Sequence, residues 1–187
     1  MSISVNDAKP GVALDLPEGL VVVLDYQHVK PGKGKAFVRL KLRNLTTGSV
    51  VDKTFRAGEK VEQAVIDKRE HQYTYHDELG HHFMDMETYA DVVLAEDLAA
   101  EAAPYLADGM VVVLPVYDGK PVGIDLPASV ELEVTYAEPA VKGDRVSGAT
   151  KPVTLSTGLV VQAPLFVEQG EVLKISTSTG AYITRVS

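Results

Sequence analysis

Two stretches of this 187-residue chain combine residue types that could do chemistry, and the first is a turn around one lysine. Pro31 fixes its own φ and biases Lys30 toward an extended conformation, whereas Gly32 and Gly34 both permit positive φ. Lys33 stands between the two glycines, so no neighbouring side chain covers its ammonium group. The turn therefore presents a single cation that could reach into a partner, although an ordinary exposed turn has the same composition.

The second stretch is a group of histidines interleaved with acidic residues: His71, His76, His81 and His82, with Asp77 and Glu78 between them. If 71–76 and 81–86 pair as a hairpin, some of the imidazoles share one face. None of the pairs has the i, i+4 spacing of a helical zinc motif, and the chain has no cysteine. A solvated, acidic hairpin with neutral histidines is favoured, so we predict no metal ligands. A hydrolase or metal protein is kept only as a third alternative.

Other kinds of catalysis find no support in the residue pattern. The segment from Gly32 to Ala36 lacks the first glycine of a phosphate-binding P-loop, and no Ser or Thr follows its lysine. A Gly-x-Ser-x-Gly nucleophile elbow is absent, and the carboxylates of the middle third are scattered. We therefore predict no catalytic residues, no cofactor and a protein that is not an enzyme.

Composition and charge restrict the class of protein. No apolar run approaches the roughly 20 residues of a membrane span, and the N-terminus lacks the features of a signal peptide, so we expect a cytoplasmic protein. The net charge of −8 is unevenly distributed. Residues 1–63 carry ten Lys/Arg against seven Asp/Glu, residues 64–127 three against thirteen, and residues 128–187 five against six. A basic first third on an acidic body predicts oriented docking on phosphates.

The elements that would position Lys33 are short β-strands. The Val-rich run 20–24 precedes the turn and the alternating run 38–43 follows it. In a strand, alternation places Val38, Leu40 and Leu42 inward and puts three cations together outward, Arg39, Lys41 and Arg43. That outer face could contact phosphates or simply aid solubility. With a further strand at 49–55, residues 1–63 are typical of a small SH3-like barrel.

The remaining chain also consists mainly of predicted strands. In residues 64–127 we predict the hairpin 71–76/81–86, a helix over 94–106, and strands at 110–117 and 123–126, a pattern that suits an OB-type barrel. Residues 128–187 predict a second such barrel, with short runs at 130–134, 153–155, 159–161, 165–167, 171–175 and 181–186. The chain is thus predicted to be all-β, with domains at 1–63, 64–127 and 128–187.

Several of these residues occur in a pattern that resembles the bacterial elongation factor P family. The resemblance spans the chain and its motifs stand in the right order: Lys30-Pro31-Gly32-Lys33-Gly34-x-Ala36-Phe37, Lys41-Leu42-Arg43-Asn44-Leu45-x-Thr47-Gly48, Lys53-Thr54-Phe55, Lys142-Gly143-Asp144, Lys151-Pro152, Leu155-Ser156-Thr157-Gly158, Pro164-Leu165-Phe166-Val167 and Gly170-Glu171. One departure is Arg145, which follows Gly143-Asp144 where the family usually has threonine.

The resemblance implies a monomeric, L-shaped, tRNA-mimicking protein with a KOW/SH3-like domain and two OB-type barrels. Such factors bind both subunits of the ribosome between the peptidyl and exit tRNA sites and relieve stalling at consecutive prolines. In the family the residue at the position of Lys33 is often extended by a lysine-modifying enzyme and points at the peptidyl transferase centre. The remaining RNA-contact candidates are Lys30, Lys35, Arg39, Lys41, Arg43, Gly143, Asp144 and Arg145. The alternative is a paralogue with another ribosome- or RNA-docking role that acts unmodified.

Overall fold

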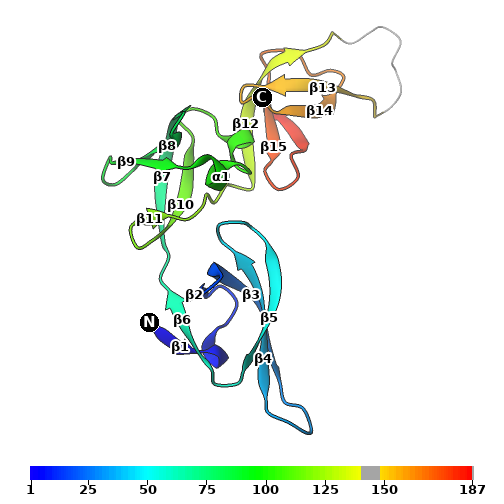
Figure 1. Cartoon of the computed structure of the whole chain (residues 1–187). Coiled ribbons are helices and arrows are strands. Elements are labelled where there is room, and N and C mark those ends of the chain that lie inside the picture. The colour runs from blue at the N-terminus through cyan, green and yellow to red at the C-terminus, as the bar shows by residue number, and fades with distance from the viewer. Residues whose placement is uncertain (140–147, 187) are drawn as a thin grey trace. The chain divides into compact units, whose positions relative to one another are not determined.

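The computed structural model describes residues 1–139 and 148–186, and nearly all its regular structure is strand. Three sheets form, in the orders β1-β6-β2-β3-β4-β5, β11-β10-β7-β8-β9 and β14-β13-β12-β15-β16 (Figure 1). The chain divides into two compact units, Met1–Arg69 with Leu114–Gly123, and Glu70–Val113 with Ile124–Ser187. The predicted all-β class is confirmed. None of the described helices is long and apolar enough to cross a bilayer.

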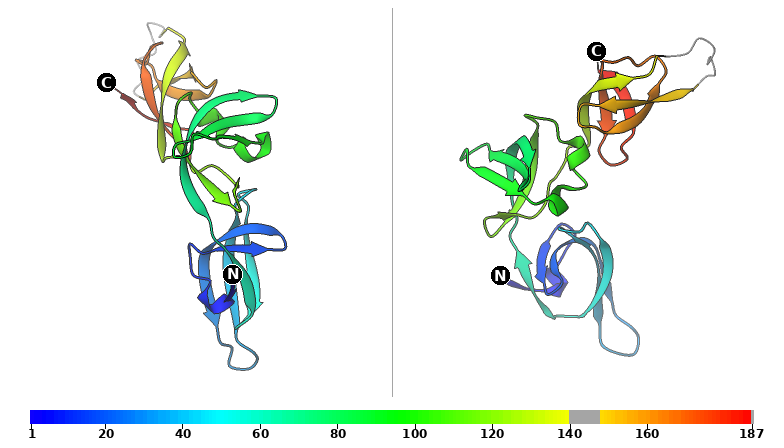
Figure 2. Two further views of the ribbon diagram at one scale, coloured as in Figure 1. Left: turned by 90° about the vertical axis from the view of Figure 1, so that its left-hand side faces the viewer. Right: turned by 45° about the horizontal axis from the view of Figure 1, so that its top comes forward.

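The first sheet curls around its own hydrophobic core (Figure 2). Val38, Leu40 and Leu42 have no exposed area, while the cations between them face solvent, so the predicted alternation is confirmed. The strands are β1 (Ser2–Ser4), β2 (Ala13–Leu16), β3 (Gly19–Val29), β4 (Phe37–Asn44), β5 (Val50–Arg56) and β6 (Lys60–Ala64), with a 3-10 helix at Val5–Asp7.

Strand β3 is longer than the predicted 20–24 because it continues through the polar residues that lead to the lysine turn. Its antiparallel pairing with β4 runs to Val29 opposite Phe37, with a register shift between Val23 and Asp25. The apolar run predicted only the buried half of the strand. The other half is held by cross-strand hydrogen bonding rather than by burial.

The second sheet contains β7 (Asp67–Asp77), β8 (Gly80–Asp85), β9 (Asp91–Leu94), β10 (Val111–Tyr117) and β11 (Lys120–Pro121). The predicted helix over 94–106 is wrong. Leu94 ends β9 opposite His81, only Glu96–Ala99 is α-helical (α1), and Ala103–Tyr105 is a 3-10 helix. Leu94, the first residue of the predicted helix, is paired in a strand instead. Pro104 lacks the backbone N–H that a longer helix needs. The predicted strand 123–126 is also wrong, since its only described pairing is the single bridge Val113–Asp125.

The histidine hairpin forms as predicted in pairing, but its predicted solvation is wrong. His71, His81 and His82 are at most 5% exposed, and β8, which carries two of them, is hydrogen-bonded to β7 on one side and β9 on the other. His82 lies 3.1 Å from a carboxylate oxygen of Asp91 through Nδ1, and 3.1 Å from one of Asp77 through Nε2. Acidic residues around this hairpin therefore serve as partners of buried imidazoles.

Asp85 is the last residue of β8, and its carboxylate holds the turn that follows. This carboxylate makes the stability of the middle domain depend on pH. Its carboxylate accepts hydrogen bonds from the backbone N–H groups of Thr88 (2.9 Å) and Glu87 (2.8 Å), and it lies 3.6 Å from Nε2 of buried His71. The N–H groups of Thr88 and Glu87, and then the charge of His71, hold the pKa of Asp85 below its usual value despite burial. The ionised form therefore stabilises the fold above about pH 4.

We expect Asp85→Asn, which keeps an acceptor oxygen but loses the charge, to lower the denaturation midpoint at pH 7. Because the folded-state pKa is lowered, this deficit relative to wild type should shrink as the pH falls through the folded pKa of Asp85. Thermal denaturation of both proteins between pH 7 and pH 2 measures it. A deficit that stays constant across that range would contradict the assignment.

The third sheet contains β12 (Ser129–Ala137), β13 (Thr150–Leu155), β14 (Val160–Pro164), β15 (Val172–Ser176) and β16 (Tyr182–Val186) around a second core. The predicted run 165–167 is not a strand, since β14 ends at Pro164 and a turn follows. Lys151 is buried and donates from Nζ to the carbonyl oxygen of Glu138 at 2.6 Å. Three residues predicted to contact RNA, Gly143, Asp144 and Arg145, lie outside the described residues.

Candidate functional site: a basic hairpin tip

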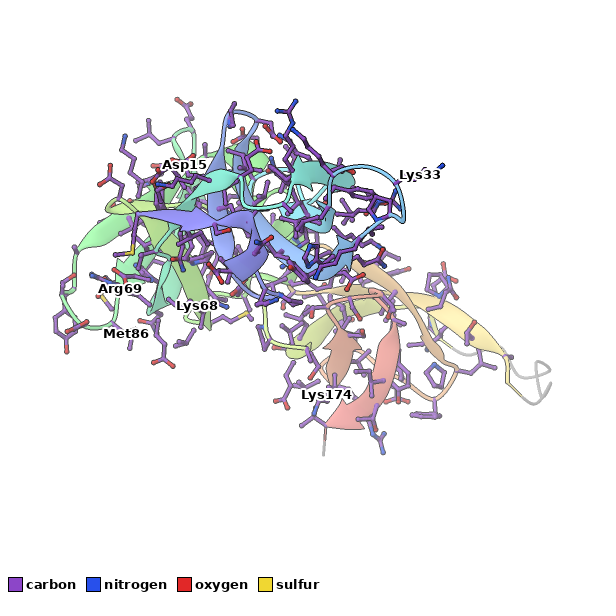
Figure 3. The ribbon with its side chains drawn as sticks, turned by 90° about the horizontal axis from the view of Figure 1, so that it is seen from below. Asp15, Lys33, Lys68, Arg69, Met86 and Lys174 are labelled. Carbon is purple, nitrogen blue, oxygen red and sulfur yellow. The ribbon has the colours of Figure 1, made fainter. Side chains whose placement is uncertain are left out.

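The lysine turn joins two paired strands, so it is the end of a hairpin that the first sheet supports. Strands β3 and β4 pair along their length, and the segment 30–36 connects them beyond the last pair, Val29 and Phe37. Figure 1 shows this hairpin projecting from the rest of its sheet. In Figure 3 the side chain of Lys33 points away from the sheet at the far end of the loop.

Only one of the two glycines beside Lys33 uses its conformational freedom. Gly34 has φ +115°, a value that residues with a side chain rarely adopt, whereas Gly32 is outside the positive-φ region. A Cβ added to Gly34 would meet Pro31 Cγ at 3.7 Å, an ordinary contact. Backbone conformation, rather than lack of space, therefore requires glycine at position 34.

Among the residues that the structure describes, the cations of the tip have no compensating partner. Lys30, Lys33 and Lys35 are exposed, and none makes a hydrogen bond or ion pair with any residue in the described part of the chain. By contrast, Lys53 of neighbouring β5 pairs with Glu18. Three ammonium groups within six residues attract anions, and no side chain must be displaced before they bind one.

The outer face of β4 extends this charge, but unevenly. Arg39 stands opposite Gln27 on β3 and Thr54 on β5, so its cross-strand neighbours are neutral. Lys41, by contrast, stands opposite Asp25 and Asp52. Directly opposed residues lie about 5 Å apart, close enough for these carboxylates to offset the charge of Lys41.

Arg43, the third cation on this face, stands opposite Val22 and Val50. Its neighbours are apolar, so no opposed carboxylate offsets its charge. Residues 26–51 contain no acidic residue in the sequence. Only the strand register shows that Asp25 and Asp52, just outside that interval, flank Lys41. The part of the basic surface that has no directly opposed carboxylate therefore consists of the tip lysines with Arg39 and Arg43.

Three domain models of one family of translation factors match successive parts of the chain. The elongation factor P KOW-like domain matches residues 4–61, its OB domain matches residues 66–124, and its C-terminal domain matches residues 130–185. The chain therefore belongs to the elongation factor P family, a family of translation factors that act on the ribosome. The domain boundaries at 63 and 127 stay a prediction.

Solved structures support the fold. A eukaryotic translation initiation factor 5A from Methanococcus jannaschii matches with a TM-score of 0.50 and 21% identity, over 67% of this chain and 94% of its own. A translation initiation factor eif-5a family protein from Naegleria fowleri matches with a TM-score of 0.51 and 18% identity, over 67% of this chain and 98% of its own. At these identities the similarity is one of fold.

Proposed function

We propose that this chain is an elongation factor that binds the ribosome between the peptidyl and exit tRNA sites and stimulates peptide-bond formation at consecutive prolines. The observation that carries the proposal is the uncompensated Lys33 at the end of a hairpin, in a chain matched by all three elongation factor P domains. A projecting cation that none of the described residues engages is suited to contact RNA in a confined site.

In this mechanism Lys33 contributes position rather than acid–base chemistry. Its ammonium group, on the plain side chain or after extension by a lysine-modifying enzyme, contacts the peptidyl-tRNA and restricts it to geometries from which the proline nitrogen can attack. Holding reactants in a reactive arrangement lowers the entropic part of the barrier without a proton transfer by the factor. Bond formation is catalysed by ribosomal RNA, so the factor is not itself an enzyme.

The other tip cations dock the hairpin on RNA phosphates. Lys30, Lys35, Arg39 and Arg43 supply uncompensated charge, while Lys41 contributes less because two carboxylates flank it. The acidic middle third disfavours binding in the reverse orientation, since RNA phosphates repel it. Gly143, Asp144 and Arg145 are further RNA-contact candidates in the third domain. We place the factor in the cytoplasm, as a monomer.

The difference between Arg39 and Lys41 leads to a test. We expect Arg39→Ser to weaken binding to empty ribosomes several-fold, and Lys41→Ser to have a smaller effect, because Asp25 and Asp52 already offset part of the charge of Lys41. Lost phosphate contacts also flatten the dependence of affinity on salt. Titration of a labelled factor at several salt concentrations measures both. Equal losses for the two variants would contradict the proposed difference.

The function itself can be tested in cells that lack the gene. Such cells should produce less of a reporter with a Pro-Pro-Pro insert than of the same reporter without proline, and the wild-type gene should remove this difference. The alternative, a paralogue with another ribosome- or RNA-docking role that acts unmodified, predicts equal expression of both reporters. Intact mass of the protein from its native cell adds information, since extra mass on Lys33 favours the first function.

A further inference from the structure

A second candidate site lies in the histidine hairpin, which shares no residue with the lysine turn and is independent of the proposed function. His76 on β7 and His81 on β8 are directly opposed in the hairpin, and their rings stack with centroids 4.3 Å apart. Glu96, the first residue of α1, reaches the same point. Its Oε2 lies 2.9 Å from His76 Nε2 and 3.4 Å from His81 Nε2, and the three donor atoms are all within 4.8 Å of one another.

His81 is an anomaly among the buried histidines. It is only 5% exposed, yet neither of its ring nitrogens makes a hydrogen bond with a described residue, and only Glu96 Oε2 approaches Nε2, at 3.4 Å. His82, its neighbour in sequence, has a carboxylate oxygen 3.1 Å from each ring nitrogen. Leaving a buried polar group without a partner destabilises a fold, so such a group needs a reason. A ligand held at the Nε2 of His81 would supply one.

The donor set and its spacing suit a transition-metal cation. Zinc binds imidazole nitrogens and carboxylate oxygens at about 2.0–2.2 Å with tetrahedral geometry, which places donors about 3.3 Å apart. The distances of 2.9 Å and 3.4 Å from Glu96 Oε2 are close to that value. The stacked rings do not yet converge on one point, but the side chain of His76 is 49% exposed and that of Glu96 is 67% exposed, so both can turn toward an ion.

We propose that His76, His81 and Glu96 form a binding site for a divalent cation of the zinc class, with a fourth position open to solvent. Two imidazoles with one carboxylate favour zinc, cobalt or nickel over magnesium and calcium, which prefer oxygen donors alone. The ion would connect the start of α1 to the β7–β8 hairpin. It would thereby stabilise the middle domain in proportion to its occupancy.

The site was missed in the sequence because its third ligand is distant. The histidines alone, five residues apart, lack a recognised metal spacing, and Glu96 stands fifteen residues beyond His81. Glu96 joins them because α1 follows directly after β9, which pairs with β8 through Leu94 opposite His81. Only the strand register brings the three donors together.

Titration of the full-length, metal-free protein with zinc chloride tests the proposal. Calorimetry should give one saturable site per chain, and cobalt chloride should give the visible absorption of a tetrahedral ion. His76 and Glu96 are exposed ligands, so His76→Gln and Glu96→Gln should keep the wild-type circular dichroism. Loss of a direct ligand should weaken zinc binding by about tenfold or more. Loss of a residue that only orients a metal ligand already lowers metal affinity by about that factor.

Two matched controls accompany these variants. His28→Gln removes an exposed histidine of β3, and Asp97→Asn removes the exposed carboxylate next to Glu96. Both should bind zinc as wild type does. Absence of a saturable site, or unchanged affinity in either His76→Gln or Glu96→Gln, would overturn the proposal. Neither result bears on Pro-Pro synthesis, because the site shares no residue with the lysine turn.

Discussion

Lys33→Ala is expected to abolish the stimulation of Pro-Pro-Pro synthesis while leaving the folded protein unchanged. The side chain is exposed and makes no hydrogen bond or ion pair with any residue that the structure describes, so its loss removes nothing from the fold. If the ammonium group restricts the peptidyl-tRNA, the rate of the stalled step should fall by at least about tenfold, equivalent to about 1.4 kcal/mol of barrier. Reporter expression and the denaturation midpoint measure the two effects.

Lys35→Ala is the matched control for this prediction. Lys35 has the same charge and exposure two residues away, but it does not stand at the tip between the glycines. It should retain most of the stimulation and lose only some ribosome affinity. Equal loss of stimulation in both variants would show that total loop charge, rather than the position of Lys33, matters.

Gly80→Ala is expected to have the largest effect on stability, about 4 kcal/mol of the unfolding free energy of the middle domain. Gly80 begins β8 with φ +131°, and a Cβ built there would lie 2.1 Å from the carbonyl oxygen of Leu94. That oxygen belongs to the backbone of β9, so no flexible side chain can move aside. The β8–β9 pairing must shift, or the substitution is not accommodated. Chemical denaturation measures the loss.

Gly109→Ala separates the clash from the backbone strain. Gly109 also has positive φ, +79°, but its added Cβ would meet only the side chain of Gln72, at 3.7 Å. Gly109→Ala should therefore lower the unfolding free energy by only the roughly 1–2 kcal/mol that a non-glycine residue costs in a left-handed conformation. Similar losses at Gly80 and Gly109 would contradict the close approach to Leu94.

The sequence predicted those parts of the fold in which a local pattern of apolar and polar residues determines the secondary structure. The alternation from Val38 to Arg43 predicts a strand with one buried face, because a side chain in a strand points to one face or the other. The polar half of β3 could not be predicted from hydrophobicity, since its partner strand holds it. The Ala-rich run after Leu94 has high helix propensity, yet strand pairing and Pro104 confine α1 to four residues.

The candidate sites divide in the same way. The exposure of Lys33 could be predicted, because Pro and Gly neighbours define a turn locally. The compensation of Lys41 by Asp25 and Asp52, and the approach of Glu96 to His76 and His81, depend on which strands become neighbours. No short segment of the sequence specifies which strands pair over such long distances along the chain. For the same reason the histidines were predicted to be solvated although three are buried.

The most direct test of the proposed function is the rate of a single Pro–Pro bond on purified ribosomes, measured by rapid quench with and without the factor from its native cell. The reaction uses peptidyl-prolyl-tRNA in the peptidyl site and prolyl-tRNA as acceptor, with a matched pair that contains no proline. We predict that the factor accelerates the proline pair by at least about tenfold and leaves the other pair unchanged. No acceleration, or equal acceleration of both pairs, would contradict a role at consecutive prolines.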